Sequence, residues 1–365
     1  MRRSSIVFIL FVLITGGIVG YNAFLRQQPP IQITLAVDPA AEDWATQLVT
    51  AFNERNVQVG AAAARVRFVV DATKKDVNVW QGDVNWTSDN HPEAWLAMAS
   101  WIVEFAPSNL FFNLVEPSLA TSPLVWGGFE SRVNLATDTG LVSLDWSTAQ
   151  TVAEAESWEA LGAPSSWRFV NIGMNSPASS VAGMNSMVSM LGSYTTNAIL
   201  DSSTFGDSAF RAWFNPLKQA MQNTVALGES PVNSMASRGV TVAGFGIAPE
   251  YEWLANLQNL VRQERVTFSY ADYGAALDFP LAIWEDEKTT DEERQAIRAF
   301  ADFVKSADGQ QITLLAGLRP IGVVPSQTDP IFANAEQYGI TLTLEDVPQV
   351  TFDRNVAEQL VRLMQ

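Results

Sequence analysis

Cysteine is absent from this 365-residue chain, and histidine occurs once, at His91. Without cysteine the chain has no disulfide framework, no thiolate metal site, no cysteine nucleophile and no residue to carry an N-terminal lipid. A single histidine excludes paired-histidine metal ligation, and a Ser/His/Asp triad would have to use His91. Nucleophile-elbow, Walker A and complete dinucleotide-binding motifs are missing as well. We therefore expect no metal and no cofactor.

Positive charge is also scarce. The chain has 22 Lys and Arg against 39 Asp and Glu, a net charge of −17. Three arginines lie in the first 30 residues without any acid, so the rest has 19 basic and 39 acidic side chains, a net charge of −20. Such an acidic body is a poor ligand for nucleic acid or anionic lipid, and we expect no nucleic-acid partner. With 47% hydrophobic and 17% charged residues, the composition is that of a globular protein.

One long apolar run is present at the N-terminus. Arg2 and Arg3 precede residues 6–25, which contain no charged side chain. A helix of this length spans about 30 Å, the thickness of the bilayer core. The run is longer than a usual signal-peptide core, although a cleaved signal peptide is the alternative interpretation. We predict an uncleaved signal anchor and tether over 1–30, one transmembrane helix in the cell membrane, with the body on the extracytoplasmic side.

Strands and helices alternate along the body, which predicts an α/β fold. Ile31–Val37 is typical of a buried strand, and Asp38-Pro39 after it combines an N-cap with proline at the first helical position. Thr290-x-x-Glu293 is a capping box that starts the clearest helix, which we expect to end near Gly309. A short strand is expected near 77–80 and a helix from Pro92. Further strands are expected at 66–70, 124–126, 169–173, 240–247, 266–270 and 280–284, and further helices at 181–191, 250–261 and 356–363.

Four stretches of the body follow one another in an informative order. They are Leu35–Asp38 with its helix ending at Ala51–Glu54, Pro92–Trp101, Ser122–Trp126, and Phe279–Trp284 with the capped helix 290–306 and Gly317–Pro320. In order and spacing they resemble the type II solute-binding proteins of bacterial ABC transporters, in the branch near the oxyanion-binding proteins. In that family Pro92–Trp101 corresponds to the helix after the second binding loop. No single stretch is a signature, so the resemblance depends on their order.

The resemblance implies a two-lobed, periplasmic-binding-protein-like type II fold. Two α/β lobes would be joined by two crossover strands, near 123–126 and 270–280, and would close on ligand by hinge bending. Because the chain would leave the first lobe once and return once, lobe one would be discontinuous. We expect it to comprise 31–123 plus 275–365, and lobe two to comprise 124–274.

Polar groups at the ends of elements that would face the cleft are candidate ligand contacts. Asn175–Ser180 is the strongest candidate, because hydroxyls and free N–H groups gather where a strand gives way to a helix. Asp38 has the matching place in lobe one, although its carboxylate would repel an oxyanion. Tyr251 and Glu252 are weaker candidates at a later helix start. The predicted ligand-binding residues are Asp38, Thr87, Ser88, Ser122, Asn175, Ser176, Ser179, Ser180, Tyr270 and Asp272.

Aromatic residues widen the range of ligands. The chain has 12 tryptophans, and Trp86, Trp126 and Trp146 lie in or near expected loops, where a ring can stack on a sugar. The ligand class therefore stays open between an oxyanion, a sugar and another polar organic solute.

The resemblance predicts a membrane-anchored extracytoplasmic solute-binding protein without catalysis. It would capture a small polar solute in the interlobe cleft for an ABC permease or a sensor. A surface adaptor on the same fold is the alternative, and it predicts an occluded cleft and an exposed apolar patch. A surface hydrolase is a lesser alternative, because nothing in the sequence isolates an acid and a base.

Overall fold

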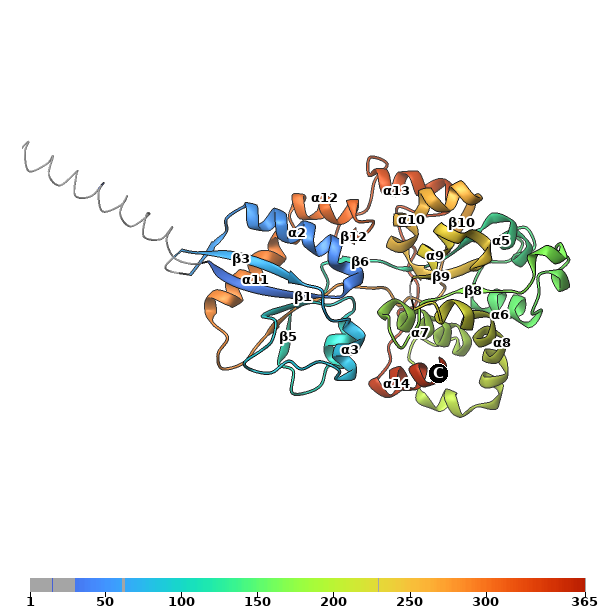
Figure 1. Cartoon of the computed structure of the whole chain (residues 1–365), viewed down its shortest axis with the longest axis horizontal. Coiled ribbons are helices and arrows are strands. Elements are labelled where there is room, and N and C mark those ends of the chain that lie inside the picture. The colour runs from blue at the N-terminus through green and yellow to red at the C-terminus, as the bar shows by residue number, and fades with distance from the viewer. Residues whose placement is uncertain (1–14, 16–29, 61–62, 229, 365) are drawn as a thin grey trace, which may run out of the picture.

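The computed structural model describes residue 15 and residues 30–60, 63–228 and 230–364. Within these residues the chain forms two α/β lobes side by side, as predicted (Figure 1). The predicted anchor over 6–25 lies outside the described residues apart from Thr15. In the part of the chain that is described, no helix is long and apolar enough to cross a bilayer.

A six-stranded mixed sheet forms the core of lobe one. The central strand β1 pairs in parallel with β3 and β4, and β11 adds antiparallel to β4. The second half of β1 is buried on both faces, which explains its continuous apolar run. In spatial order the strands are β2 (Gln58–Val59), β3 (Ala64–Asp71), β1 (Ile31–Val37), β4 (Ala94–Leu96), β11 (Leu281–Trp284) and β5 (Phe112–Glu116).

Lobe two contains a smaller sheet of four strands. Strand β7 pairs antiparallel with both β10 and β9, and β8 joins β9 in parallel. All residues of β7 and β9 are buried, as in a sheet covered on both faces. In spatial order the strands are β10 (Val266–Tyr270), β7 (Leu124–Phe129), β9 (Phe245–Pro249) and β8 (Ile172–Gly173).

Helices cover both sheets (Figure 1). Around the first sheet lie α2 (Glu42–Glu54), α3 (Asp76–Gln81), α4 (Ser100–Glu104), α11 (Asp291–Val304) and α12 (Ala307–Leu315), with the 3₁₀ turn η1 (Pro39–Ala41). Around the second lie α5 (Glu130–Ala136), α6 (Trp146–Glu154), α7 (Val181–Thr195), α8 (Ser208–Val225), α9 (Pro231–Arg238), α10 (Glu250–Gln263) and η4 (Ser202–Gly206). The predicted capping box is present at Thr290, whose hydroxyl accepts from the Glu293 N–H.

Several local predictions are wrong, and the strand expected at 240–247 begins only at Phe245, after a 3₁₀ turn over Gly239–Thr241. The helix expected from Pro92 is instead strand β4 followed by the short α4, and the strand expected near 77–80 is α3. Strand β4 lies between β1 and β11, so its three residues are buried on both faces. A short run of apolar residues fits the spacing of a helix as well as that of a buried strand, so the sequence did not distinguish the two. The wrong prediction in α3 arose because one asparagine lies between two valines, which gives the alternation of apolar and polar residues that is typical of a strand. The capped helix ends at Val304, five residues before the expected stop, and α12 follows.

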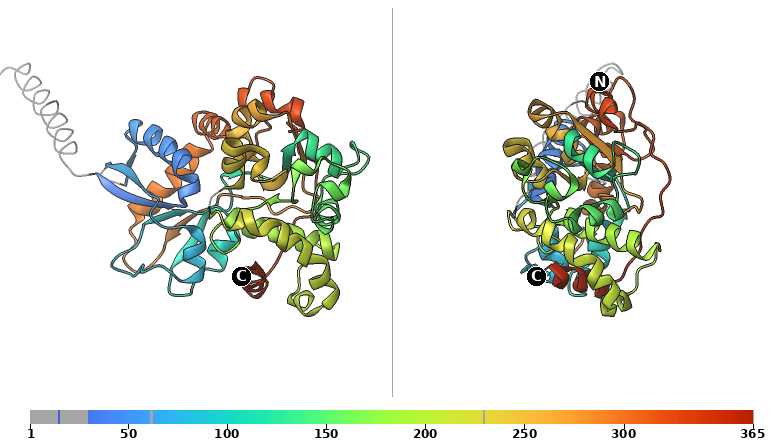
Figure 2. Two further views of the ribbon diagram at one scale, coloured as in Figure 1. Left: turned by 45° about the vertical axis from the view of Figure 1, so that its right-hand side comes forward. Right: turned by 90° about the vertical axis from the view of Figure 1, so that its right-hand side faces the viewer.

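The chain crosses between the lobes close to the predicted positions. Ser122 and Leu277 exchange two backbone hydrogen bonds of 2.9 and 3.0 Å, which tie the outgoing and returning segments together. A C-terminal segment follows β12 (Arg319–Pro320), which pairs with β6 (Ala120–Thr121). The predicted lobe boundaries at 123 and 275 would assign the last helices of the chain to lobe one. These boundaries stay a prediction. In the structure, α13 (Pro330–Ala335) packs on α10 and α12, and α14 (Arg354–Met364) packs on α7 and η4 (Figure 2).

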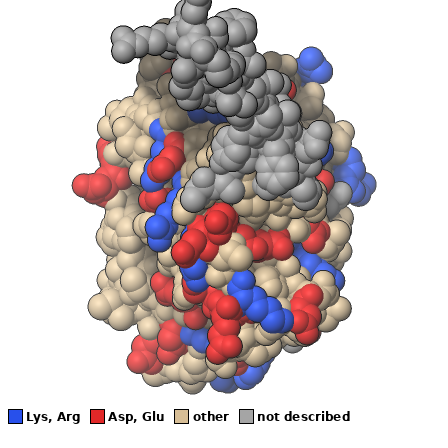
Figure 3. Space-filling view, turned by 90° about the vertical axis from the view of Figure 1, so that its left-hand side faces the viewer, with Lys and Arg blue, Asp and Glu red and all other residues tan. Residues whose placement is uncertain are grey.

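The surface of lobe one carries charges of both signs. On the end of the molecule seen in Figure 3, acidic and basic side chains lie side by side. Lobe-one ion pairs include Arg294 with Glu285 and Lys305 with Glu116. The acidic surplus of the chain therefore does not form a single-sign field on that face.

Candidate ligand-binding site

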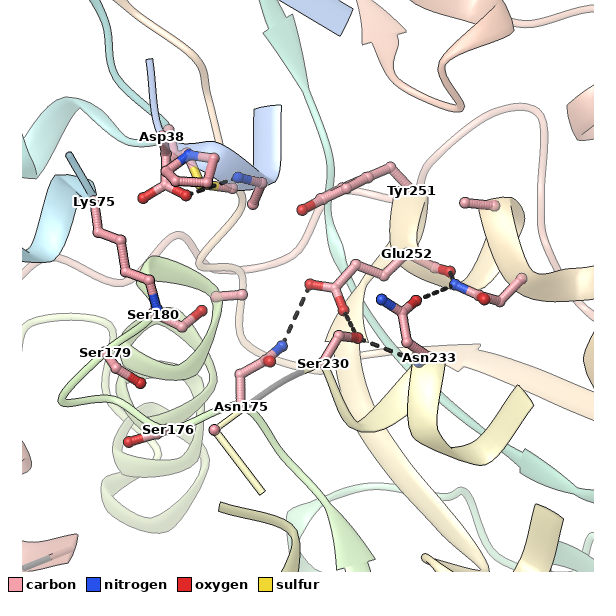
Figure 4. Close-up of a pocket in the computed structure, with 17 residues that line it drawn as sticks. Asp38, Lys75, Asn175, Ser176, Ser179, Ser180, Ser230, Asn233, Tyr251 and Glu252 are labelled. Atoms are coloured by element: carbon pink, nitrogen blue, oxygen red, sulfur yellow. Dashed lines mark hydrogen bonds between the residues drawn. The ribbon is translucent and has the colours of Figure 1, made fainter. Parts of the chain in front are cut away.

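A cavity of about 440 Å³ lies between the lobes, and both contribute to its wall. Lobe one supplies the turn after β1 and the residue before α3. Lobe two supplies the N-terminal ends of α7, α9 and α10 (Figure 4). Its volume is within the range of small-molecule sites in proteins, which is about 300–1,000 Å³.

Asp38 is the main polar group on the lobe-one wall. Its side chain caps η1, with Oδ1 accepting from the Ala40 N–H at 2.9 Å and Oδ2 accepting from the Asp76 N–H at 2.8 Å. Burial raises the pKa of Asp38, against the opposing effect of these bonds. Behind it, Asp76 is buried and accepts from the Trp95 indole at 2.8 Å and the Met98 N–H at 2.6 Å. Burial and the nearby Asp38 raise the pKa of Asp76 well above its usual value.

Glu252 is the acidic group of the lobe-two wall. The side-chain amide of Asn175 donates to it at 3.3 Å, and the hydroxyl of Ser230 donates to its other oxygen. Burial raises the pKa of Glu252, and these two bonds oppose the rise. Ser230 also caps α9, and Asn256 links α10 to Asn233 through a 2.7 Å hydrogen bond. The carboxylate is thus held by two residues, one in the loop after β8 and one at the N-terminus of α9.

The start of α7 forms a side of the cavity that is rich in hydrogen-bond donors. Ser180 is the N-cap of this 15-residue helix, and its hydroxyl accepts from the Gly183 N–H at 3.4 Å. The hydroxyls of Ser176 and Ser179 line the cavity without a hydrogen bond to any residue that the structure describes. Lys75 extends from lobe one toward Ser180 (Figure 4). A helix N-terminus with a nearby cation favours negative charge.

Tyr251 lies between the two walls. Its backbone N–H donates to the Ser122 hydroxyl at 3.1 Å, which fixes the start of α10 to the outgoing crossover. Its phenol reaches into the cavity and has no hydrogen bond to any described residue (Figure 4). Burial raises the pKa of Tyr251 well above its usual value, and the charges of Glu252 and Asp38 raise it further. The phenol is therefore neutral and available to a ligand.

The structure brings five of the ten predicted site residues to this cavity. They are Asp38, Asn175, Ser176, Ser179 and Ser180.

The other five predicted residues lie elsewhere. Thr87 pairs with Asn90 in a tight turn, and the Ser88 carbonyl accepts from Lys288, so both belong to a surface loop of lobe one. Ser122 is fully buried at the crossover and acts on the cavity through the Tyr251 backbone.

Tyr270 and Asp272 face a different hollow. They line a second cavity of about 630 Å³, bounded by the returning crossover and residues 341–349. The Tyr270 hydroxyl bonds to Glu250, and Asp272 accepts from the Ser193 hydroxyl at 2.9 Å. Their predicted ligand contact gains no support from this placement.

Sequence reasoning missed Lys75, Ser230 and Asn233. A signal was available for Ser230, because Ser230-Pro231 repeats the N-cap and N1-proline pattern of Asp38-Pro39. Lys75 had no such signal, since it is one exposed lysine in a polar loop. Only the packing of lobe one against lobe two brings it to the cavity.

The tryptophans suggested as stacking partners belong to the core. Trp126 and Trp146 are fully buried and meet edge to face at 4.7 Å, and Trp86 packs on Trp95 and Phe112. None of the three lines the interlobe cavity.

Two α/β lobes joined by crossover segments, with a polar cavity walled by both, define a two-lobed binding protein. The chain belongs to the family of bacterial extracellular solute-binding proteins, whose sequence pattern it matches over residues 33–319. Family membership confirms the predicted resemblance and function: this is a solute-binding protein, from a family of binding proteins and not of enzymes, and its body is extracytoplasmic.

Solved structures confirm the fold. A periplasmic thiamin binding protein aligns with a TM-score of 0.56 at 11% identity, over 92% of this chain and 96% of its own. The GacH receptor of Streptomyces glaucescens aligns with a TM-score of 0.55 at 11% identity, over 92% and 94%. An ABC transporter structure from Clostridium perfringens gives 0.53 at 13%, over 91% and 98%. Among curated proteins, none matches.

Proposed function

We propose that the interlobe cavity is the ligand site and that the protein hands its solute to an ABC permease. The observation that supports this most is the convergence of the η1, α7, α9 and α10 N-terminal ends from both lobes on one cavity. Because each helix start presents unsatisfied N–H groups and capping side chains, the cavity offers several polar contacts to a small solute. Contacts from both lobes would favour the closed form when a ligand binds.

The adaptor alternative gains no comparable support. It requires a cleft filled by side chains, whereas the cleft contains a cavity with polar groups directed into it. The fold by itself does not choose the solute, because structures with this fold include a thiamin binding protein and a receptor in complex with acarbose.

Thermal unfolding with a solute panel tests the site. We expect at least one polar solute to stabilise the native state, by about 2.7 kcal/mol at 100 times its dissociation constant. Ser179→Phe should abolish this effect, because the Ser179 side chain lines the cavity and its hydroxyl has no hydrogen bond to lose among the described residues. Ser166→Phe is the matched control on an exposed 3₁₀ turn, and it should leave the effect unchanged. Equal behaviour of the two variants would place the site elsewhere.

We propose further that the N-terminal segment anchors the protein in the cell membrane. Support comes from the sequence, where a basic pair precedes twenty uncharged and largely apolar residues at 6–25. We expect the protein to stay with carbonate-washed membranes, to retain residues 6–25, and to be digested by protease added outside the cell. A soluble chain that begins beyond residue 25 would show cleavage instead.

A further inference from the structure

The interlobe cavity is lined by charged groups of both signs. Asp38 and Glu252 are the acids that line it, and their side chains reach it from opposite lobes. Lys75 is the basic residue of the lining, and it makes no ion pair with any described residue. In Figure 4, Asp38 and Lys75 lie on the lobe-one side with the Lys75 ammonium group beside Ser180, while Glu252 and Tyr251 lie on the opposite side.

No described cation forms an ion pair with either acid, and Lys75 acts only on Asp38, where its charge opposes the rise in the pKa of that carboxyl. Asp38 is 6% exposed and Glu252 is 9% exposed, and the groups that bond to their oxygens are neutral amides, backbone N–H groups and a hydroxyl. A buried carboxylate is stabilised by a cation far more than by neutral donors. The neutral Tyr251 phenol beside them can accept a hydrogen bond from an ammonium group. This end of the cavity is suited to a cation.

The opposite end is suited to an anion. Helix α7 has no acidic residue in its first turn, so the positive end of its dipole is not neutralised. Ser180 lies beside the Lys75 ammonium group, and the hydroxyls of Ser179 and Ser176, free of partners among the described residues, follow farther along the same side of the cavity. An anionic group here would receive charge-assisted hydrogen bonds.

We propose that the solute is a small zwitterion, with a protonated amine between Asp38 and Glu252 and an anionic group at Lys75 and the α7 N-terminus. This assignment depends on the proposed function of the cavity and adds the ligand class. It also explains why an oxyanion alone fits poorly, since two carboxylates face the same space. Because the two acids belong to different lobes, the amine would link the lobes on closure.

Isothermal titration of the full-length protein in detergent tests the ligand class. The probes are the proteinogenic amino acids, β-alanine and γ-aminobutyrate as zwitterions, putrescine as a cation, sulfate as an anion and maltose as a neutral solute. We expect one of the zwitterions to bind at least about tenfold more tightly than any of the other three, since each of those leaves one end unpaired. Tighter binding of sulfate, maltose or putrescine overturns the assignment but preserves the proposed function. Failure of every probe, together with no stabilising solute in the wider panel, overturns both.

Charge-removing variants separate recognition from structure. Glu252→Gln should weaken the zwitterion about 10- to 100-fold, and Lys75→Met about tenfold. With putrescine, Lys75→Met should strengthen binding, because it removes repulsion of the second ammonium group. Glu159→Gln and Lys288→Met are the matched controls on exposed surface away from the cavity, and they should change neither affinity. Equal losses for putrescine and zwitterion in Lys75→Met would contradict the anionic end.

The pH dependence gives an independent readout. The ionisable groups that face one another here are Asp38, Asp76 and Lys75 from lobe one and Tyr251 and Glu252 from lobe two. Since the pKa values of the carboxyls are raised and an ammonium ligand would lower them, binding should release protons and weaken as the pH falls from 7.5 to 5. In Glu252→Gln this decline should be shallower. An affinity that is constant or rises over that range contradicts the assignment.

Discussion

Replacing Arg319 by methionine is expected to lower the free energy of unfolding by about 3–5 kcal/mol, because the change leaves a buried carboxylate without its cation. The Arg319 side chain is 5% exposed and that of Glu250 is fully buried. Two guanidinium nitrogens donate to the two Glu250 oxygens at 2.6 and 2.7 Å. The same guanidinium donates to the carbonyls of Thr341 and Leu342 at 2.6 and 2.8 Å. Arg319 therefore joins the returning chain to the first turn of α10, next to the cavity.

Denaturant unfolding followed by tryptophan fluorescence measures this effect. Arg55→Met is the matched control, since Arg55 pairs with the exposed Asp308, and we expect a loss below about 1 kcal/mol. The double variant Arg319→Met/Glu250→Leu should recover part of the loss, because it removes the uncompensated charge. If Arg319→Met is no more destabilised than Arg55→Met, the ion pair does not hold this junction.

Gly183→Ala is expected to destabilise the protein by about 1–3 kcal/mol and to weaken solute binding at least about tenfold. A Cβ at residue 183 would lie 2.4 Å from the Asn175 carbonyl oxygen and 2.5 Å from the Ser176 carbonyl carbon. Because these are backbone atoms, they cannot rotate away, and the loop would have to retreat from α7 by about 1 Å to reach ordinary contact at 3.4 Å. Such a shift would displace Asn175 from Glu252 and open the wall of the cavity.

Gly206→Ala provides the matched comparison for Gly183→Ala. Gly206 lies in η4 on the surface, with open space where a Cβ would stand, so its substitution should leave both stability and affinity nearly unchanged. Isothermal titration and denaturant unfolding of the two variants give both quantities. Wild-type affinity in a folded Gly183→Ala protein would show that the 175–176 loop does not contribute to the site.

The elements that sequence predicted well begin with strong local signals. The Thr290 capping box and the Asp38-Pro39 turn both act through atoms a few residues away, so the sequence contains the whole interaction. Half of the predicted site residues line the interlobe cavity for the same reason, since Asp38 and Asn175–Ser180 follow strands and start helices. The prediction failed at β4, because its short apolar run fits a helix and a buried strand equally well. The segment is a strand because it is buried between two neighbouring strands of the sheet.

The α/β class, the family resemblance and the polar segment Asn175–Ser180 follow from the order of residues. Capping, periodicity and chain polarity are short-range properties, so the sequence alone contains them. The rest depends on contacts between residues far apart in the chain. Glu252 meets Asn175 across 77 positions and Arg319 meets Glu250 across 69. Lys75 becomes part of the cavity only when lobe one faces lobe two. Such pairings have no period or motif, because burial and charge balance are properties of the packed molecule and not of a segment.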